Sequence, residues 1–392
     1  MNVRSFSKRV RSIQVSAIKQ MPIKAADVPG AISLGQGIPS VKTPGYIRRK
    51  IAELLERDEK LGMYSLQPGV PALREAIAAE ISARVGRPVS WKEEVFISAG
   101  AMEALFTAMV SIIEEEDEVI LFDPCYASHI EQVLFAGGTP VFVHLEEGEG
   151  WNLPIEKLKT SISPKTKAIV VCNPANPTGT VFSKDELGAI AELVQNHGLY
   201  LIADETYDFL VYDDVNFTSL SEFKNIKEQV ILCNSFSKRF AMTGFRVGYM
   251  YAPSAVIEQA LKVHDAAVIA APTISQYAAL AALTETPGED SVNIHQLLLK
   301  RRDLLCSRLE SLSSRFSFVK PQGAYYVMVR YHDSDRSAIE YADDLLYSAK
   351  VITIPGSAFG PAGEHHIRMS FGGSEDDIHK AFDQIERWSP HE

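Results

Sequence analysis

Five short apolar runs in the middle of the chain are each followed by glycine or polar residues that could bind a ligand. These following segments are Ala99-Gly100-Ala101, Asp123-Pro124-Cys125-Tyr126, residues 173–179, Asp204-Glu205-Thr206-Tyr207 and residues 234–238. Arg246 comes eight residues after Lys238, the last residue of the fifth segment. In a parallel sheet, ligands bind beyond the carboxyl ends of the strands. If the runs are parallel strands, one edge of the sheet gathers lysine, aspartate, asparagine, aromatic rings, hydroxyls and arginine.

Part of this set suits a phosphate group. A helix that opens after the first run presents backbone N–H groups, which bind anions well. Serine hydroxyls and an arginine would add hydrogen bonds and charge. The residues expected around the phosphate are Gly100, Ala101, Met102, Ser235, Ser237 and Arg246.

The remaining residues suit a flat heteroaromatic ring that carries an aldehyde. Such a ring would stack on Tyr126. A ring nitrogen that must stay protonated needs a carboxylate, which Asp204 supplies. A ring oxygen would accept hydrogen bonds from Tyr207 and Asn176, and an aldehyde would condense with the amine of Lys238. The ligand that combines these parts is pyridoxal 5′-phosphate, and we expect it as the cofactor, with no metal.

The elements that must position these residues are strands that alternate with helices. The expected buried strands are Val95–Ser98, Val119–Phe122, Ala168–Cys172, Leu199–Ala203 and Val230–Cys233. Helical patterns cover Ala101–Ile113, parts of 127–136 and Lys184–Asn196. This alternation predicts an α/β fold with a mostly parallel sheet flanked by helices.

The pattern changes after Pro287-Gly288. A long amphipathic helix is expected over His295–Leu312, followed by strands at Tyr325–Val329 and Val351–Ile354. These elements predict a smaller α+β domain. We therefore expect a large domain over residues 46–285, and a small domain made of residues 286–392 together with an N-terminal arm, residues 1–45.

The motifs resemble those of the class I/II, fold-type-I pyridoxal-phosphate aminotransferases of the aspartate aminotransferase superfamily. The Ser-x-Ser-Lys signature with its following Gly-x-Arg is matched by residues 235–238 and 244–246. Asn-Pro-x-Asn-Pro-Thr-Gly at 173–179 and Asp-Glu-x-Tyr at 204–207 stand in the family's order. Two departures are Thr206, where an aliphatic residue is usual, and His129, where a tyrosine is frequent.

The resemblance implies an amino-group transfer between an L-amino acid and a 2-oxo acid. Lys238 would hold the cofactor as an aldimine and then move the proton, with Asp204 and Tyr207 as the other catalytic residues. Gly37, Asn176 and Arg368 would bind the substrate, the arginine through its α-carboxylate. Tyr64 resembles the tyrosine that reaches the phosphate in the partner subunit, so a homodimer with shared sites is expected.

Two other functions share parts of this pattern. Pyridoxal-phosphate lyases of the cysteine-S-conjugate β-lyase or aminocyclopropane-carboxylate synthase type carry the same motifs, but nothing in the sequence favours them. A cofactor-sensing DNA-binding regulator would need a module for which the sequence before the motifs leaves little room. The net charge of −11 also disfavours nucleic-acid binding. The aminotransferase is therefore the preferred prediction.

The cysteines and the N-terminal segment bear on the cellular compartment. The four cysteines have no disulfide or metal-ligand spacing, which favours a reducing compartment. The basic segment before Asp27 resembles a transit peptide, but the family resemblance already begins near Val10, so a cytoplasmic location is expected.

We identify no second cation for a dicarboxylate substrate. Residues 35–39 and Tyr126 favour an aromatic, methionine-like or broad substrate range, and no apolar run is long enough to span a membrane.

Overall fold

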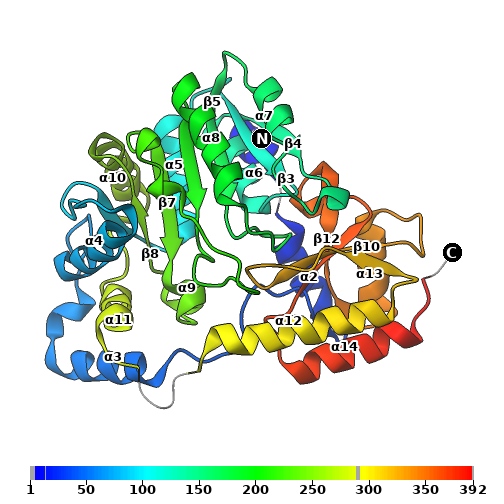
Figure 1. The fold of residues 1–392 in the computed structure, drawn as a ribbon. Helices are drawn as coiled ribbons and strands as arrows, with labels where there is room; N and C mark the ends of the chain where they lie inside the picture. Colours follow the sequence, from blue (N-terminus) through cyan, green and yellow to red (C-terminus); the bar gives the residue numbers. More distant parts are fainter. Residues whose placement is uncertain (1–4, 14, 288–291, 391–392) are drawn as a thin grey trace.

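The computed structural model describes residues 5–13, 15–287 and 292–390 (Figure 1). A seven-stranded sheet of order β2-β8-β7-β6-β5-β3-β4 forms the centre of the larger part. Its strands are β2 (Val95–Ser98), β3 (Glu118–Asp123), β4 (Thr139–His144), β5 (Thr166–Cys172), β6 (Tyr200–Asp204), β7 (Val230–Ser235) and β8 (Gly248–Tyr251). The neighbouring strands β7, β6, β5, β3 and β4 pair in parallel, whereas β8 is antiparallel to β7 and to β2. The predicted α/β class with a mostly parallel sheet is confirmed.

Both faces of this sheet are buried, which explains why its strands are apolar runs. In β3, Ile120 and Phe122 pack into one hydrophobic core, while Val119 and Leu121 pack into another. Side chains alternate between the two faces of a strand, so each core lies on its own face. The helices of the first face are α7 (Ile155–Ser161) and α8 (Lys184–His197); those of the second are α5 (Ala101–Ile112), α6 (Ala127–Ala136) and α10 (Ser254–Val268).

A third core lies at the β2 end of the sheet. It joins residues of β2, β7 and β8 to α3 (Gly45–Arg57), α4 (Pro71–Val85) and α11 (Thr273–Thr284). The expected strand list lacked β4 and β8. Each begins in or beside glycine-containing sequence, and β8 has only four residues, so their apolar runs are short.

A smaller antiparallel sheet of order β12-β13-β10-β9 lies beside the large one (Figure 1). Its strands are β9 (Phe316–Phe318), β10 (Tyr326–Tyr331), β12 (Ile354–Pro355) and β13 (His366–Ser370). The helices with it are α12 (Ile294–Ser311), α13 (Ala338–Tyr347) and α14 (Glu375–Arg387). The long helix expected at His295–Leu312 is thus present, shifted by one residue at each end.

The N-terminal segment packs with this smaller part. It contains α1 (Lys8–Ser12), α2 (Ala17–Ala25) and β1 (Ile32–Ser33), and β1 pairs in parallel with β11 (Val351–Ile352). Helix α2 contacts β11 and β12. Part of the linker where we expected the domain boundary, residues 288–291, lies outside the described residues. None of the described helices has both the length and the apolar character needed to cross a membrane.

Candidate active site

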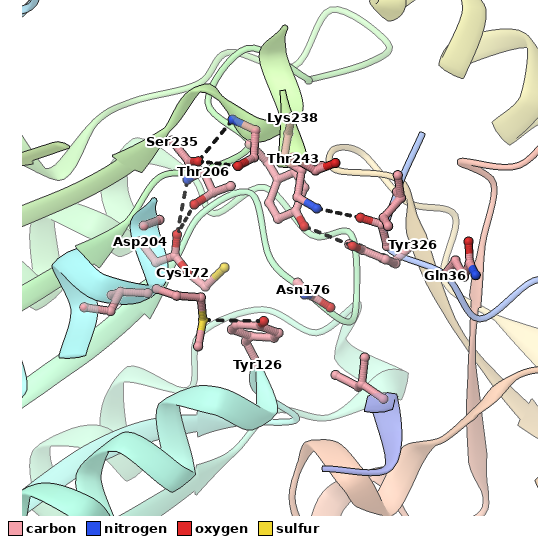
Figure 2. Close-up of a pocket in the computed structure, with 18 of the residues that line it drawn as sticks. Gln36, Tyr126, Cys172, Asn176, Asp204, Thr206, Ser235, Lys238, Thr243 and Tyr326 are labelled. Carbon is pink, nitrogen blue, oxygen red and sulfur yellow. Dashed lines mark hydrogen bonds between the residues drawn. The ribbon is translucent and has the colours of Figure 1, made fainter. Parts of the chain in front are cut away.

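A cavity of about 660 Å³ lies at the carboxyl ends of β5, β6 and β7, where the N-terminal segment and the smaller sheet close over the large sheet (Figure 2). Most of the residues expected at the site line this cavity. They are Gly37, Ala101, Met102, Tyr126, Asn176, Asp204, Tyr207, Ser235, Ser237, Lys238, Arg246 and Arg368. Gly100 lies directly behind the lining, and Tyr64 lies elsewhere on the surface.

Asp204 ends β6 with its carboxylate buried, and each of its two oxygens has a hydrogen-bond partner. Its Oδ1 accepts hydrogen bonds from the amide (3.2 Å) and the hydroxyl (2.7 Å) of Thr206, and its Oδ2 lies 3.1 Å from Nε2 of His129. Burial alone would raise the pKa of Asp204, but the hydrogen bonds from His129 and Thr206 lower it below its ordinary value. The site therefore contains a fixed negative charge.

Lys238 lies in α9 (Phe236–Arg239), the short helix that follows β7. Its Nζ donates to the backbone carbonyl of Gly37, 2.5 Å away, which also accepts from the Tyr325 hydroxyl at 2.8 Å. Burial lowers the pKa of the Lys238 ammonium, and the positive charges of Arg368 and Arg246 lower it further. An amine with a lowered pKa is a better nucleophile and base near neutral pH.

Arg368 comes from β13 and is 1 % exposed. Its Nη1 donates to Oδ1 of Asn176 (3.1 Å) and its Nη2 to the carbonyl of Gly35 (2.8 Å), while the guanidinium lies 4.3 Å from the centre of the Tyr326 ring. Nε of this arginine is buried and has no hydrogen-bond partner among the described residues. The guanidinium therefore keeps donor capacity for an anion.

Two tyrosines lie on the cavity wall near Lys238. The hydroxyls of Tyr207 and Tyr326 are 3.0 Å apart, and the rings meet edge to face. Burial raises the pKa of Tyr207, so its hydroxyl remains protonated and can donate to a ligand oxygen. A Cβ atom on Gly37 would lie 2.4 Å from the Tyr326 hydroxyl oxygen, so only glycine fits there without displacing that tyrosine.

The groups expected around a phosphate gather at the first turn of α5. Arg246 donates from Nη2 to the carbonyl of Ala99 (3.3 Å) and from Nη1 to that of Thr243 (3.1 Å). Gly100, the residue before α5, has a φ of 86°, and a Cβ there would lie 2.5 Å from Nη2 of Arg246. Ser235 Oγ donates to Ser237 Oγ at 2.9 Å on the other side of this corner. The amide of Glu103 donates to the carbonyl of Gly100 at 3.1 Å, whereas the amides of Ala101 and Met102, at the start of α5, have no intrahelical partner and are available to an anion.

Tyr126 and Tyr64 differ sharply in environment. Tyr126 lines the cavity immediately before α6, and its ring meets that of His129 edge to face at 5.4 Å. Tyr64 is 78 % exposed, beside the similarly exposed Met63 and Leu66. Within the described chain, Tyr64 does not line the cavity, so any role in a site would be toward another subunit.

Some lining residues were not expected from the sequence. Tyr326, Cys172, Thr206 and Lys19 all line the cavity. Tyr326 lies in β10, whose pairing with β13 places Met328 opposite Arg368, and no signal in the sequence reveals this pairing. Lys19 carries no motif, and only the fold brings it to the cavity.

Comparison with known proteins agrees with this geometry. Residues 29–385 match the family model described as aminotransferase class I and II. The chain is 35 % identical over 383 residues to a putative aminotransferase, YugH, of Bacillus subtilis, covering 98 % of each. It is 33 % identical over 384 residues to aromatic-amino-acid aminotransferase 2 of Thermococcus litoralis, again covering 98 % of each.

Solved structures show the same similarity. A single mutant of Thermus thermophilus aspartate aminotransferase has a TM-score of 0.90 and 34 % identity, covering 98 % of this chain and all of that one. The aromatic aminotransferase of Pyrococcus horikoshii has a TM-score of 0.87 and 33 % identity, covering 94 % of this chain and 98 % of that one.

Proposed function

Because this chain belongs to the class I and II aminotransferase family, it is an aminotransferase, and we propose that its cofactor is pyridoxal 5′-phosphate, held in the cavity described above. The observation that carries the proposal is the meeting of Lys238, Asp204 and Arg368 in one cavity, from α9, β6 and β13. A nucleophilic amine, a fixed carboxylate and a buried guanidinium are the three groups that this chemistry needs.

The residues present fit the cofactor. The glycine at position 100 leaves Arg246 room beside the first turn of α5, as a phosphate site requires. Asp204 lines the cavity, and the contacts of its carboxylate with His129 and Thr206 hold it in place. Ser235 and Ser237 would complete the phosphate site, Tyr126 would lie against the ring, and Tyr207 with Asn176 would donate to its oxygen.

When bound, pyridoxal phosphate supplies an aldehyde for the amino group and a ring that takes up the electrons of a broken Cα–H bond. The protein's part is to place charges and protons. Lys238 would hold the cofactor through Nζ, and this amine, when free, would move the proton as base and then as acid. The negative charge of Asp204 would favour a proton on the ring nitrogen.

Arg368 binds and orients the substrate. A guanidinium takes a carboxylate through two parallel hydrogen bonds, which fixes the position of Cα. Its bonds to Asn176 Oδ1 and Gly35 O hold the guanidinium in place before substrate arrives. Gly37 would line the substrate side of Lys238.

We also propose a homodimer in which Tyr64 completes the partner's site. The exposed apolar side chains of Met63 and Leu66, next to Tyr64 in the chain, support this, since such a surface is typical of an interface. The proposed domains remain residues 46–285, and residues 1–45 with 286–392. All four cysteines are free, which supports a cytoplasmic location.

The proposed substrate range is broad. Relatives of this chain are named for aspartate, aromatic amino acids and prephenate. Ile18, Ile38, Met102 and Leu105 give the cavity apolar walls that suit an aromatic or methionine-like side chain. The test is a panel of L-amino acids against 2-oxoglutarate and pyruvate. We expect one new amino acid for each donor consumed and no ammonia; ammonia with an oxo acid from the donor alone would instead indicate a lyase.

A further inference from the structure

The charges of the cavity leave one side chain without a role. Its charged lining residues, within the part of the chain that the structure describes, are Lys19, Asp204, Lys238, Arg246 and Arg368. The proposed function uses the last four, for the ring nitrogen, the aldehyde, the phosphate and the α-carboxylate. Lys19 therefore contributes a positive charge that neither the cofactor nor the common part of an amino acid needs.

Helix α2 fixes the position of Lys19 at the cavity mouth. Met21 is buried, and Nζ of Lys24 pairs with Oδ1 of Asp343 at 2.7 Å, so the helix is anchored to the smaller part of the molecule. Ile18 and Pro22 line the cavity with Lys19, as expected for residues three or four positions apart on a helix. The anchored helix thus presents one face, including the lysine, to the cavity.

No carboxylate among the described residues forms an ion pair with the ammonium of Lys19, although Lys24 on the same helix has such a partner in Asp343. Its positive charge also helps to lower the pKa of Lys238, so its charge reaches the reacting amine. Gln36, an exposed amide on the neighbouring lining segment, adds a neutral donor at the mouth.

We propose that Lys19 is a specificity-determining residue that binds the second carboxylate of a dicarboxylic substrate, while Arg368 binds the first. This inference rests on the proposed function of the cavity. Lys19 would be the second cation for a dicarboxylate, which could not be identified from the sequence. Two separated positive charges discriminate a dicarboxylate from a monocarboxylate, because only the former neutralises both.

The same cavity can still accept apolar side chains. Lys19 is exposed, and a lysine can lie with its methylene stem on an apolar wall and its ammonium in water. An aromatic substrate would then contact the walls without burying an unpaired charge. Lys19 is therefore expected to add dicarboxylic substrates to the range and to leave the apolar ones unaffected.

Binding of two small acids to the cofactor-loaded enzyme tests the proposal without turnover. Succinate and butyrate have the same carbon chain and differ in the second carboxylate. Calorimetry should show succinate binding roughly 10- to 100-fold more tightly than butyrate, the ratio for one hydrogen bond between charged groups. Lys19→Met should remove this preference, and Lys19→Arg should keep most of it. Lys8→Met, in α1 and outside the cavity lining, is the matched control for loss of one lysine from the same basic segment, and should change nothing.

Steady-state kinetics give the second readout. With Lys19→Met, kcat/KM for aspartate should fall by a similar factor, mainly through KM, and kcat/KM for phenylalanine should stay within about twofold. An unchanged preference for succinate in Lys19→Met would overturn the proposal, as would equal losses for both acids. Equal losses with weaker cofactor retention would assign Lys19 to the cofactor instead. If wild type transfers amino groups but does not prefer succinate, this inference fails while the proposed function stands; if it transfers none, the proposed function fails.

Discussion

Nε2 of His129 lies 3.1 Å from Oδ2 of Asp204, on the side of the carboxylate away from Thr206. The histidine is 1 % exposed and lies in the first turn of α6, three residues after Tyr126. In the sequence, His129 is a departure from the family pattern, where a tyrosine is frequent. Its contact shows that it orients the carboxylate, so its effect on the reaction passes through Asp204.

His129→Phe should slow turnover without removing any cavity-lining group. The change deletes a hydrogen bond to a charged group, about 1.5–3 kcal/mol, so kcat should fall roughly 10- to 150-fold. Loss of this bond also removes one cause of the low pKa of Asp204. Steady-state kinetics check this, with His197→Asn at the exposed end of α8 as the control. Equal activity of wild type and His129→Phe would exclude the orienting role.

Asp204→Asn should be far less active, because it removes the negative charge beside the ring nitrogen. Breaking a buried charge pair costs about 3–5 kcal/mol, and turnover should fall by roughly two to four orders of magnitude. A measurement of single turnover with one amino acid checks the step concerned. Near-normal rates would contradict the proposed role of the carboxylate.

The stability of the cofactor-free protein should depend on this carboxylate in a defined pH range. The pKa of Asp204 is lowered on folding, so its contribution is present above the unfolded pKa near ~3.9 and disappears as pH falls through the lower folded value. In urea unfolding, the difference in free energy of unfolding between wild type and Asp204→Asn should therefore be constant from about pH 7 to 5. Below about pH 4 this difference should shrink. A difference that grows in acid would show that the folded pKa is not lowered.

Lys238 should be the single site of covalent cofactor attachment. Borohydride reduction followed by peptide mass spectrometry should find the cofactor on Lys238, and Lys238→Ala should still bind it without turnover. Arg239, the next residue, pairs with Glu80 on the surface, so Arg239→Ala is a neighbouring control that should keep activity. A reduced adduct on another lysine would refute the assignment.

Gly100→Ala should weaken cofactor binding more than it weakens folding. At a φ of 86° an alanine is strained by about 1–3 kcal/mol, and its Cβ would displace the Arg246 guanidinium. Gly86 has a φ of 67° and a ψ of 26°, and a Cβ added there would meet nothing within 4 Å, so Gly86→Ala carries the milder strain of the left-handed region without that displacement. The midpoint temperature of thermal unfolding should fall in both variants, whereas cofactor affinity should fall only in Gly100→Ala. Similar affinities in the two would remove Gly100 from the phosphate site.

Tyr64 and Lys238 should complement each other across a dimer. If Tyr64 acts in the partner's site, a mixed dimer of Tyr64→Ala and Lys238→Ala has one site with both lesions and one intact site. Activity should then partly return on mixing two inactive variants. Subunit exchange is followed by native mass spectrometry. Exchange without recovered activity would mean that Tyr64 acts in its own subunit, or in no site.

The sequence was a good guide where chemistry and local pattern coincide. Asp204, Asn176 and Lys238 follow apolar runs, and the carboxyl ends of parallel strands meet by geometry, so their convergence could be predicted. Residues that reach the cavity from helix α2 or strand β10 could not be predicted in this way. Lys19 and Tyr326 are placed by the packing of the N-terminal segment and the smaller sheet, which depends on contacts far apart in sequence.

Thr206 and β8 illustrate two other features that could not be predicted from the sequence. Thr206 was noted as a departure from the family pattern, but only the structure shows its hydroxyl donating to Asp204. Strand β8 runs antiparallel in an otherwise parallel neighbourhood, and its four residues begin with Gly248. A short apolar run that begins at a glycine cannot be told from a turn by periodicity alone.

The hydrogen bond from Arg368 to the carbonyl of Gly35 joins residues 333 positions apart in the sequence. Gly35 is made early in synthesis, whereas Arg368 is added only with β13, near the C-terminal end of the chain. A growing chain that has just completed β8, the last strand of the large sheet, contains Asp204 and Lys238 but not yet the arginine that would hold a substrate carboxylate. Substrate binding through Arg368 is thus confined to chains that are almost complete.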